Sequence, residues 1–236
     1  MIVEVLFPEI CNLYGDLVNV EYLQRCCKDI EVVNTGLHDE PYFLNERPAL
    51  IYMGSTTEQG QELAAAALMQ YKERIFQLVG KGVPFLLTGN ALEIFGKEIL
   101  CEDGRSIPCL GIYNTVAKRD MLHRYNAPWL GKFREMDIVG YKSQFSHSWG
   151  ENQRFPLFDT VRGDGLNPET KAEGVRVNRL MATYLIGPII VLNPEFARFV
   201  LSTMGVEEPT LVFEEAMQDA FRFRMEEFNS PGQKFS

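Results

Sequence analysis

The sequence predicts a three-layer αβα fold of the flavodoxin-like class, in which a mostly parallel sheet gains additional strands in the C-terminal half. Two observations carry this prediction. In the first half, short apolar runs rich in strand-forming residues alternate with segments of helical period, which is typical of a parallel sheet. After Cys109 the segments are shorter and richer in turn residues, which indicates antiparallel strands added to the edge or face of that sheet.

The first half supplies the parallel strands and their connecting helices. Apolar runs at residues 2–7, 30–34, 49–53 and 83–87 are expected to be strands. A first helix follows the first strand, since Leu17, Val20, Leu23 and Cys27 recur at helical spacing. One long helix is expected from a cap at Thr56 or Thr57 to the glycines at 80 and 82. The sequence TGNALEIFG (88–96) then turns sharply into another helix.

The second half is more irregular. Strands are expected within 111–116, 137–142 and 174–185, and the polar stretch 159–173 is expected to be a surface loop. Asn193-Pro194-Glu195 is a strong helix start, with a capping residue, a first-turn proline and an acid. A last helix carries Phe213, Met217 and Phe221 on one side. We expect residues 1–228 to form a single domain and residues 229–236 to be a flexible tail.

Composition excludes several classes of protein. The chain has 236 residues, 46% of them apolar, and a net charge of −9, so no basic face is expected for nucleic acid or an anionic membrane. The longest late apolar run, 184–192, is too short for membrane insertion. Five cysteines without framework spacing predict free thiols and a cytoplasmic protein. The three histidines lack metal-ligand spacing, so we expect neither a metal nor a cofactor.

Four segments, in this order, carry a resemblance to a known family. They read LYGDLVNVEYL (13–23), MGSTTEQGQ (53–61), VPFLLTGNALEIFG (83–96) and TYLIGPIIVLNPE (183–195). Together they resemble class I glutamine amidotransferases of the cobyric acid synthase type, including the small-subunit type of lipid II isoglutaminyl synthase. The resemblance covers about residues 1–205.

The resemblance implies a specific chemistry. In this family a cysteine on a tight strand–turn–helix elbow attacks the side-chain amide of glutamine. Backbone N–H groups of a glycine-rich turn bind the oxyanion, and a histidine in a Tyr-Leu-His-Gly-Pro sequence takes the thiol proton. The released ammonia passes to a synthetase partner, here a Mur-ligase-like enzyme that makes or modifies cell-wall precursors.

This sequence departs from the family at the reacting positions. The elbow pattern places Gly89 at the nucleophile and Glu93 at the family's glutamine, and the histidine position is Ile186. The glycine-rich turn keeps Gly54 with Ser55 beside it, and a family Asn-His pair becomes Ser143-Gln144. With neither nucleophile nor base intact, we expect no glutaminase activity. Glycine also relaxes an elbow that is otherwise strained.

The remaining pocket residues have open alternatives. The expected pocket comprises Gly54, Ser55, Thr88, Asn90, Glu93 and Gln144. Glu93 either binds a cationic group in the former glutamine pocket or faces solvent on its helix. Thr88 is expected to bond the backbone at the strand end, and Asp16 to cap the first helix.

Three functions are therefore compared. The leading hypothesis is a degenerate amidotransferase-like protein acting as a binding or partner subunit. The second is an active hydrolase with a displaced nucleophile (Thr88, Cys101 or Cys109), which must lie near a base in the pocket bounded by Gly54, Gly89 and Ile186. The third is a stand-alone small-molecule sensor, with Glu93 or Gln144 pointing into an open cavity. A homodimer through the last helix, rich in phenylalanine, also stays open.

Overall fold

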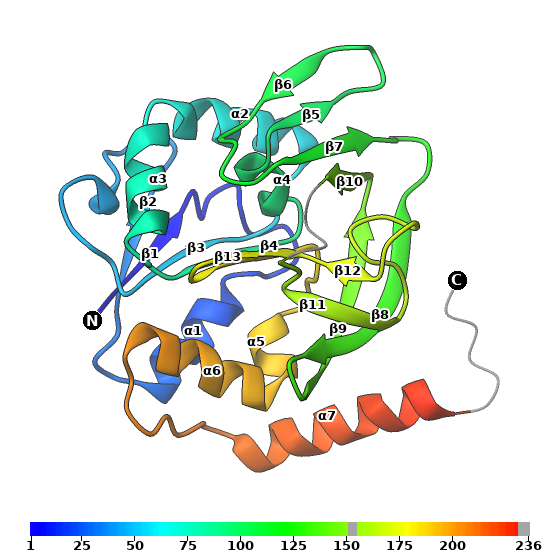
Figure 1. The fold of residues 1–236 in the computed structure, drawn as a ribbon. Helices are drawn as coiled ribbons and strands as arrows, with labels where there is room; N and C mark the ends of the chain where they lie inside the picture. The colour runs from blue at the N-terminus through cyan, green and yellow to red at the C-terminus, as the bar shows by residue number, and fades with distance from the viewer. Residues whose placement is uncertain (151–154, 231–236) are drawn as a thin grey trace.

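The computed structural model describes residues 1–150 and 155–230, and its centre is a six-stranded sheet (Figure 1). The strand order is β13-β14-β4-β3-β1-β2. Every neighbouring pair is parallel except β13 and β14, which form an antiparallel hairpin at one edge. The bounds are β1 Ile2–Leu6, β2 Glu31–Thr35, β3 Leu50–Met53, β4 Phe85–Thr88, β13 Val175–Val177 and β14 Leu180–Thr183.

Helices cover both faces of this sheet, which gives three layers. The helices are α1 Val18–Cys26, η1 Tyr42–Leu44, α2 Glu58–Met69, α3 Lys72–Gly80, α4 Ala91–Phe95, α5 Ile189–Leu192, α6 Pro194–Met204 and α7 Glu214–Asn229. In Figure 1, α2 and α3 lie on one side of the sheet and α1, α5 and α6 on the other. None of the helices in the described part of the chain has the length and apolar character needed to cross a bilayer.

The strand β3 shows why helices must cover both faces of the sheet. Ile51 and Met53 belong to the core on the α2–α3 side, and Leu50 and Tyr52 belong to the core on the α1–α6 side. All four side chains are fully buried. A strand that is apolar on both faces is stable only between two helical layers, so the continuous apolar runs correctly predicted the three-layer fold.

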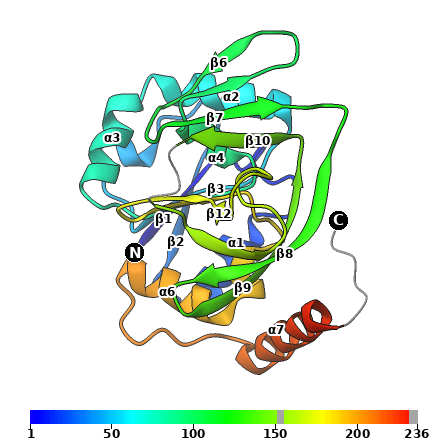
Figure 2. The same cartoon turned by 45° about the vertical axis from the view of Figure 1, so that its right-hand side comes forward.

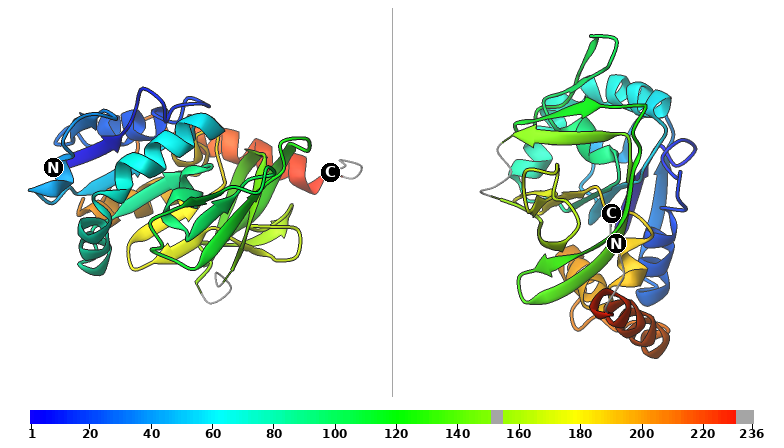
Figure 3. Two further views of the ribbon diagram at one scale, coloured as in Figure 1. Left: turned by 90° about the horizontal axis from the view of Figure 1, so that it is seen from above. Right: turned by 90° about the vertical axis from the view of Figure 1, so that its right-hand side faces the viewer.

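Two smaller four-stranded sheets account for most of the second half of the chain. One has the order β10-β7-β5-β6 and the other β12-β11-β8-β9. Figure 3 shows these strands gathered at the end of the molecule opposite the N-terminus. Their bounds are β5 Glu98–Leu100, β6 Ser106–Pro108, β7 Thr115–Arg119, β8 Tyr125–Phe133, β9 Met136–Gln144, β10 Ser146–Gly150, β11 Phe158–Arg162 and β12 Ala172–Glu173.

The strands predicted in the first half are confirmed, but the prediction of one long helix is wrong. The segment forms two helices, α2 and α3, because the backbone turns at Gln70 and Tyr71. At this turn the N–H of Tyr71 donates to Leu68 O at 2.9 Å. The predicted cap is correct, since Thr57 Oγ1 accepts a hydrogen bond from the N–H of Gly60 at 3.1 Å.

The second half corrects three expectations. Two of the expected additions, β7 and β9, belong to separate sheets, while β14 lies inside the central sheet and runs parallel to β4. The stretch 159–173 is not a surface loop, since it carries most of β11 and all of β12 and buries Leu166 and Asn167. Polar residues there are compatible with burial because Asn167 Nδ2 donates to Ser148 O at 2.7 Å.

The helix α6 begins where the sequence indicated, whereas Phe213, which was expected on the last helix, precedes α7 and is exposed. Pro194 is the first residue of α6, and Gly205 ends the helix with φ +102°. Asn193 does not cap α6, because its amide bonds both backbone groups of Val139 at 2.8 Å and so ties α6 to β9. The predicted tail begins at Asn229, which is the last residue of α7, and residues 231–236 lie outside the described part.

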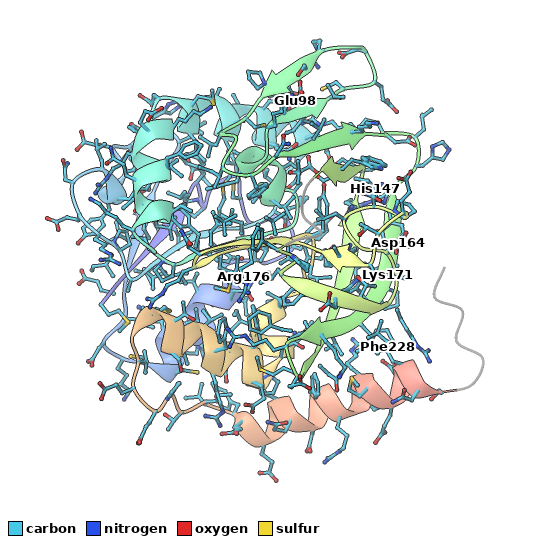
Figure 4. The ribbon with its side chains drawn as sticks, viewed as in Figure 1. Glu98, His147, Asp164, Lys171, Arg176 and Phe228 are labelled. Atoms are coloured by element: carbon cyan, nitrogen blue, oxygen red, sulfur yellow. The ribbon has the colours of Figure 1, made fainter. Side chains whose placement is uncertain are left out.

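The helix α7 packs against the outside of β8 and β9 (Figure 2). Its buried Phe228 contacts Leu130 and Val139, and Phe221 is half-buried beside it. Figure 4 shows Phe228 on the side of α7 that faces β9. Of the three phenylalanines in this helix, Phe223 is the one exposed to solvent.

A buried ion pair joins the two edge strands of the sheet β12-β11-β8-β9, and its carboxylate also contacts the central sheet. Lys142 of β9 contacts the carboxylate of Glu173 of β12, and both side chains are almost completely buried. Lys142 Nζ also donates to the carbonyls of Asp164 and Gly165, at 2.9 and 2.6 Å. The other oxygen of Glu173 accepts from Thr183 Oγ1 and from the N–H of Tyr184, both at 2.9 Å. Glu173 therefore fixes the chain where β14 ends.

We expect Lys142→Met to lower the free energy of unfolding by about 3–5 kcal/mol, because it leaves the carboxylate of Glu173 buried without a cation. Urea denaturation measures this difference. The matched control is Lys132→Met, which breaks the exposed pair between Lys132 and Asp137. That change is expected to cost less than about 1 kcal/mol, and equal losses in both variants would contradict the prediction.

Candidate functional site

The candidate site lies where β3, β4 and β14 end side by side. Parallel strands place their carboxyl ends at one edge of the sheet, and the loops that follow them form the crevice in which α/β proteins bind ligands. Here those loops begin at Gly54, Gly89 and Tyr184. The loop after β1, which contains Asp16, meets them at the same edge.

Gly89 sits on the sharp turn between β4 and α4 with φ +61°. A Cβ atom built on Gly89 would lie 2.5 Å from Ser55 Cβ and 3.3 Å from Ile186 Cγ2. The structure thus brings together the three positions that the sequence pattern aligned with the oxyanion turn, the nucleophile and the histidine. It also shows that Ser55 fills the space a side chain at position 89 would need.

Ile186 is buried beside this turn. Its N–H donates to Tyr141 O at 2.9 Å, in an isolated bridge between the loop after β14 and β9. The side chain is 4% exposed. The position is therefore filled by a packed aliphatic group, as the sequence suggested.

Asp16 is the site residue that sequence reasoning assigned wrongly. It does not cap α1, which begins after Leu17 without a side-chain cap. Its carboxylate instead accepts hydrogen bonds from Ser55 Oγ at 2.7 Å and Thr88 Oγ1 at 3.1 Å. Asp16 lies within the segment 13–23 that carried the family resemblance, which was the available signal.

Thr88 is fully buried and bonds side chains rather than the backbone. Besides Asp16, its hydroxyl contacts Tyr52 Oη at 3.0 Å. Close packing also explains Gly54, since a Cβ there would lie 2.5 Å from Cys11 O and 2.6 Å from Asp16 Cβ. These contacts place both residues beneath the surface of the site.

A cavity of about 190 Å³ opens above this layer. Three of the predicted pocket residues line it, namely Ser55, Asn90 and Gln144. Asn90 clamps the glycine-rich turn, because its amide bonds both the N–H and the carbonyl of Thr56, at 2.9 and 2.8 Å. Gln144 Oε1 is buried without a hydrogen-bond partner in the described residues. No cysteine or histidine is found among the described residues that line this cavity.

Glu93 neither faces solvent nor lines this cavity, so neither interpretation offered by the sequence holds. It is 1% exposed and accepts hydrogen bonds from Ser146 Oγ, from Tyr184 Oη at 2.9 Å and from Gln61 Nε2 at 2.9 Å. Burial raises the pKa of Glu93 above that of an ordinary glutamate, and these hydrogen bonds oppose the rise. Glu93 therefore joins α4 to α2, β10 and the end of β14.

Of the three candidate displaced nucleophiles, only Thr88 lies at the candidate site. Thr88 is at the site and within reach of the Asp16 carboxylate, but it is fully buried and does not line the cavity. Cys101 lies in the turn between β5 and β6 of the second sheet, and Cys109 directly follows β6. Burial raises the pKa of Cys109 to about 12, which disfavours a thiolate. Within the described ranges, no group of His, Cys, Asp and Glu has the arrangement of a metal site.

Comparison with known proteins agrees with this geometry. Residues 2–191 match the profile of the CobB/CobQ-like glutamine amidotransferase domain. The chain is 26% identical over 194 residues to the GatD subunit of lipid II isoglutaminyl synthase (glutamine-hydrolyzing) from Staphylococcus aureus, covering 80% of this chain and 78% of the relative. It is 22% identical over 208 residues to the same subunit from Streptococcus pneumoniae, covering 84% and 78%.

A solved structure shows the same fold. A glutamine amidotransferase from Thermotoga maritima superposes with a TM-score of 0.53 at 13% sequence identity, covering 95% of this chain and 97% of that one. The predicted fold class is thus confirmed both by the described elements and by this likeness.

The contact between Gly89 and Ser55 leads to a stability prediction. Gly89→Ala is expected to destabilise the protein by about 1–3 kcal/mol more than Gly15→Ala, because the new Cβ collides with Ser55. Gly15 is the matched control, since it also has a positive φ (+73°) but no atom within 4 Å of its Cβ position. In a Ser55→Gly background, the cost of Gly89→Ala should fall by at least about 1 kcal/mol. Urea denaturation of the four variants tests this, and additive costs would contradict it.

The buried carboxyl of Glu93 leads to a pH prediction. Because its pKa is raised in the folded protein, the folded state binds more protons, and this group's contribution to stability is lost as the pH rises above the ordinary glutamate value. Glu93→Gln removes that dependence. We expect the stability of this variant relative to the natural protein to be greater at about pH 8 than at about pH 5. The exposed Glu226→Gln is the control, and an equal difference at both pH values would refute the prediction.

Proposed function

Because this chain belongs to the family of CobB/CobQ-like glutamine amidotransferase domains, we propose that it is the amidotransferase-like subunit of a synthetase that amidates lipid II, and that its own site does not hydrolyse glutamine. Similarity to two lipid II isoglutaminyl synthase subunits supports the first part. The arrangement of Ser55, Gly89 and Ile186 supports the second.

The meeting of these three residues is the observation that carries the proposal. Acyl transfer from glutamine needs a nucleophile at the elbow and a base within hydrogen-bond reach of it. At the elbow, Gly89 offers no side chain, and Ile186 offers no proton acceptor. Ser55 occupies the space that a side chain at position 89 would need, and its hydroxyl is held by Asp16 at 2.7 Å.

The partner we propose is a Mur-ligase-like synthetase, by analogy with the relatives. In such a complex this subunit would support the synthetase while free ammonium ions supply the nitrogen. All five cysteines are free thiols, which supports a location in the cytoplasm. A homodimer through α7 would use its exposed Phe223, and the oligomeric state in solution tests that option.

Hydrolysis by Ser55 is the second candidate. It is favoured by one observation, the 2.7 Å hydrogen bond from Ser55 Oγ to the buried Asp16 carboxylate at the wall of the cavity. A carboxylate can accept the hydroxyl proton of a nucleophilic serine. No imidazole is found among the described cavity-lining residues to return a proton to the leaving ammonia.

Ammonia release from glutamine distinguishes these functions. The tagged full chain is purified gently with its bound partner and assayed beside the glutamine-hydrolyzing subunit from Staphylococcus aureus as a positive control. We expect no release above a heat-treated blank. The same preparation should amidate its precursor with ammonium chloride but not with glutamine.

Ser55→Ala is the matched variant for this assay. Release of ammonia that disappears in Ser55→Ala would overturn the proposal in favour of the serine mechanism. Failure of a Mur-ligase-like synthetase to co-purify would contradict the partner assignment alone, since the glutamine assay does not depend on it.

A further inference from the structure

A hollow lined by arginines lies at the opposite edge of the central sheet from the candidate site. Its volume is about 320 Å³, and its lining includes Arg134, Arg176, Arg179, Asn178 and Ser202. We call it the arginine hollow. It lies at the amino edge of the sheet, because Arg179 directly precedes β14 and its carbonyl accepts a hydrogen bond from the N–H of Phe85 at the start of β4.

Three separate segments bring the arginines together. Arg134 lies in the turn between β8 and β9, where it holds φ +56°. Arg176 is in β13, between Val175 and Val177, which contact the core on the α2–α3 side. Strand alternation therefore directs Arg176 to the other face, where α6 lies, and Figure 4 labels it on β13. Arg179 comes from the turn between β13 and β14.

These guanidinium groups have no acidic partner. Among residues 1–150 and 155–230, no carboxylate lies within 4.0 Å of Arg134, Arg176 or Arg179. The described lining of the hollow contains no Asp or Glu. In a chain of net charge −9, a concave site with three arginines and no acidic residue in its described lining is a local patch of positive charge.

Two of the arginines are already held in place. The guanidinium of Arg134 lies over the rings of Phe133 and Phe199, 5.2 Å from each ring centroid. Arg179 donates one hydrogen bond to Thr203 O at 3.4 Å. Ring contacts use the face of a guanidinium and leave its N–H edge available, so these side chains lose little conformational freedom on binding an anion.

We propose that the arginine hollow binds a phosphate or diphosphate group carried by a small molecule. A guanidinium presents a planar fork of N–H donors that matches phosphate oxygens, and three such groups balance the charge of a diphosphate. The exposed hydroxyl of Ser202 adds a neutral donor. The concave shape and small volume favour a compact anionic group over the extended acidic surface of a protein.

Titration calorimetry with sodium pyrophosphate at low ionic strength tests the assignment. The full chain should show saturable binding that weakens as salt is raised. Arg176→Gln and Arg179→Gln should each weaken binding by about tenfold, because each removes a charge-assisted hydrogen bond. The control is Arg222→Gln, an arginine of α7 paired with Asp219 outside the hollow, which should bind pyrophosphate normally.

A second variant distinguishes loss of the binding site from loss of the fold. Ser202→Glu adds a negative charge at an exposed position of α6 and should abolish binding while leaving the melting temperature without ligand unchanged. The proposal would be overturned if the natural chain showed no saturable binding of pyrophosphate. It would also be overturned if Arg176→Gln, Arg179→Gln and Ser202→Glu all bound pyrophosphate as tightly as the natural chain. So would tighter binding of polyglutamate than of pyrophosphate, which would indicate an acidic protein partner.

A vesicle experiment then separates the two sources of the group. Phosphatidylcholine vesicles containing phosphatidic acid should not sediment the chain if the ligand is a free phosphorylated molecule. Sedimentation that Ser202→Glu abolishes would assign the group to a lipid headgroup. Neither outcome depends on glutaminase activity, so this inference and the proposed function can fail independently.

Discussion

The ion pair between Lys142 and Glu173 connects the architecture to the site. Glu173 accepts hydrogen bonds at the end of β14 from Thr183 and Tyr184, two residues before Ile186. Lys142 lies on β9, the strand that also bonds the N–H of Ile186 through Tyr141. The loop that would carry a catalytic histidine in this fold is therefore held by the added strands of the second half. Because a buried charge without its partner is costly, β9 and β12 must keep this arrangement.

The other buried carboxylates at this edge are likewise satisfied by protein donors. Asp16 accepts from Ser55 and Thr88, and Glu93 accepts from residues of three different elements. A carboxylate that is saturated by internal hydrogen bonds stabilises one arrangement of its neighbours and has little capacity left for a substrate. The polar layer beneath the cavity thus positions the loops, while the cavity itself is lined by neutral side chains such as Asn90 and Gln144 and by the charged Glu58 and Arg124.

The sequence was most informative where local pattern decides structure. Runs that are apolar on both faces predicted the parallel strands, and the family resemblance implied that Gly54, Gly89 and Ile186 would meet. Sequence pattern could not show that 159–173 pairs with β8, because that pairing joins distant segments. Nor could it place Asp16 or Glu93, because hydrogen-bond partners such as Ser55 and Tyr184 come from other loops and leave no periodic signal.

Ser55 and Gly89 must be understood as a pair. With Ser55 present, any Cβ at position 89 would lie 2.5 Å from Ser55 Cβ, which real side chains do not tolerate. Ser55 in turn is held in place by Asp16, whose own Cβ packs against Gly54. A single replacement at position 89 would therefore restore a side chain without restoring the space it needs. On these grounds the absence of a side chain at position 89 is built into the packing of three loops and does not rest on one residue.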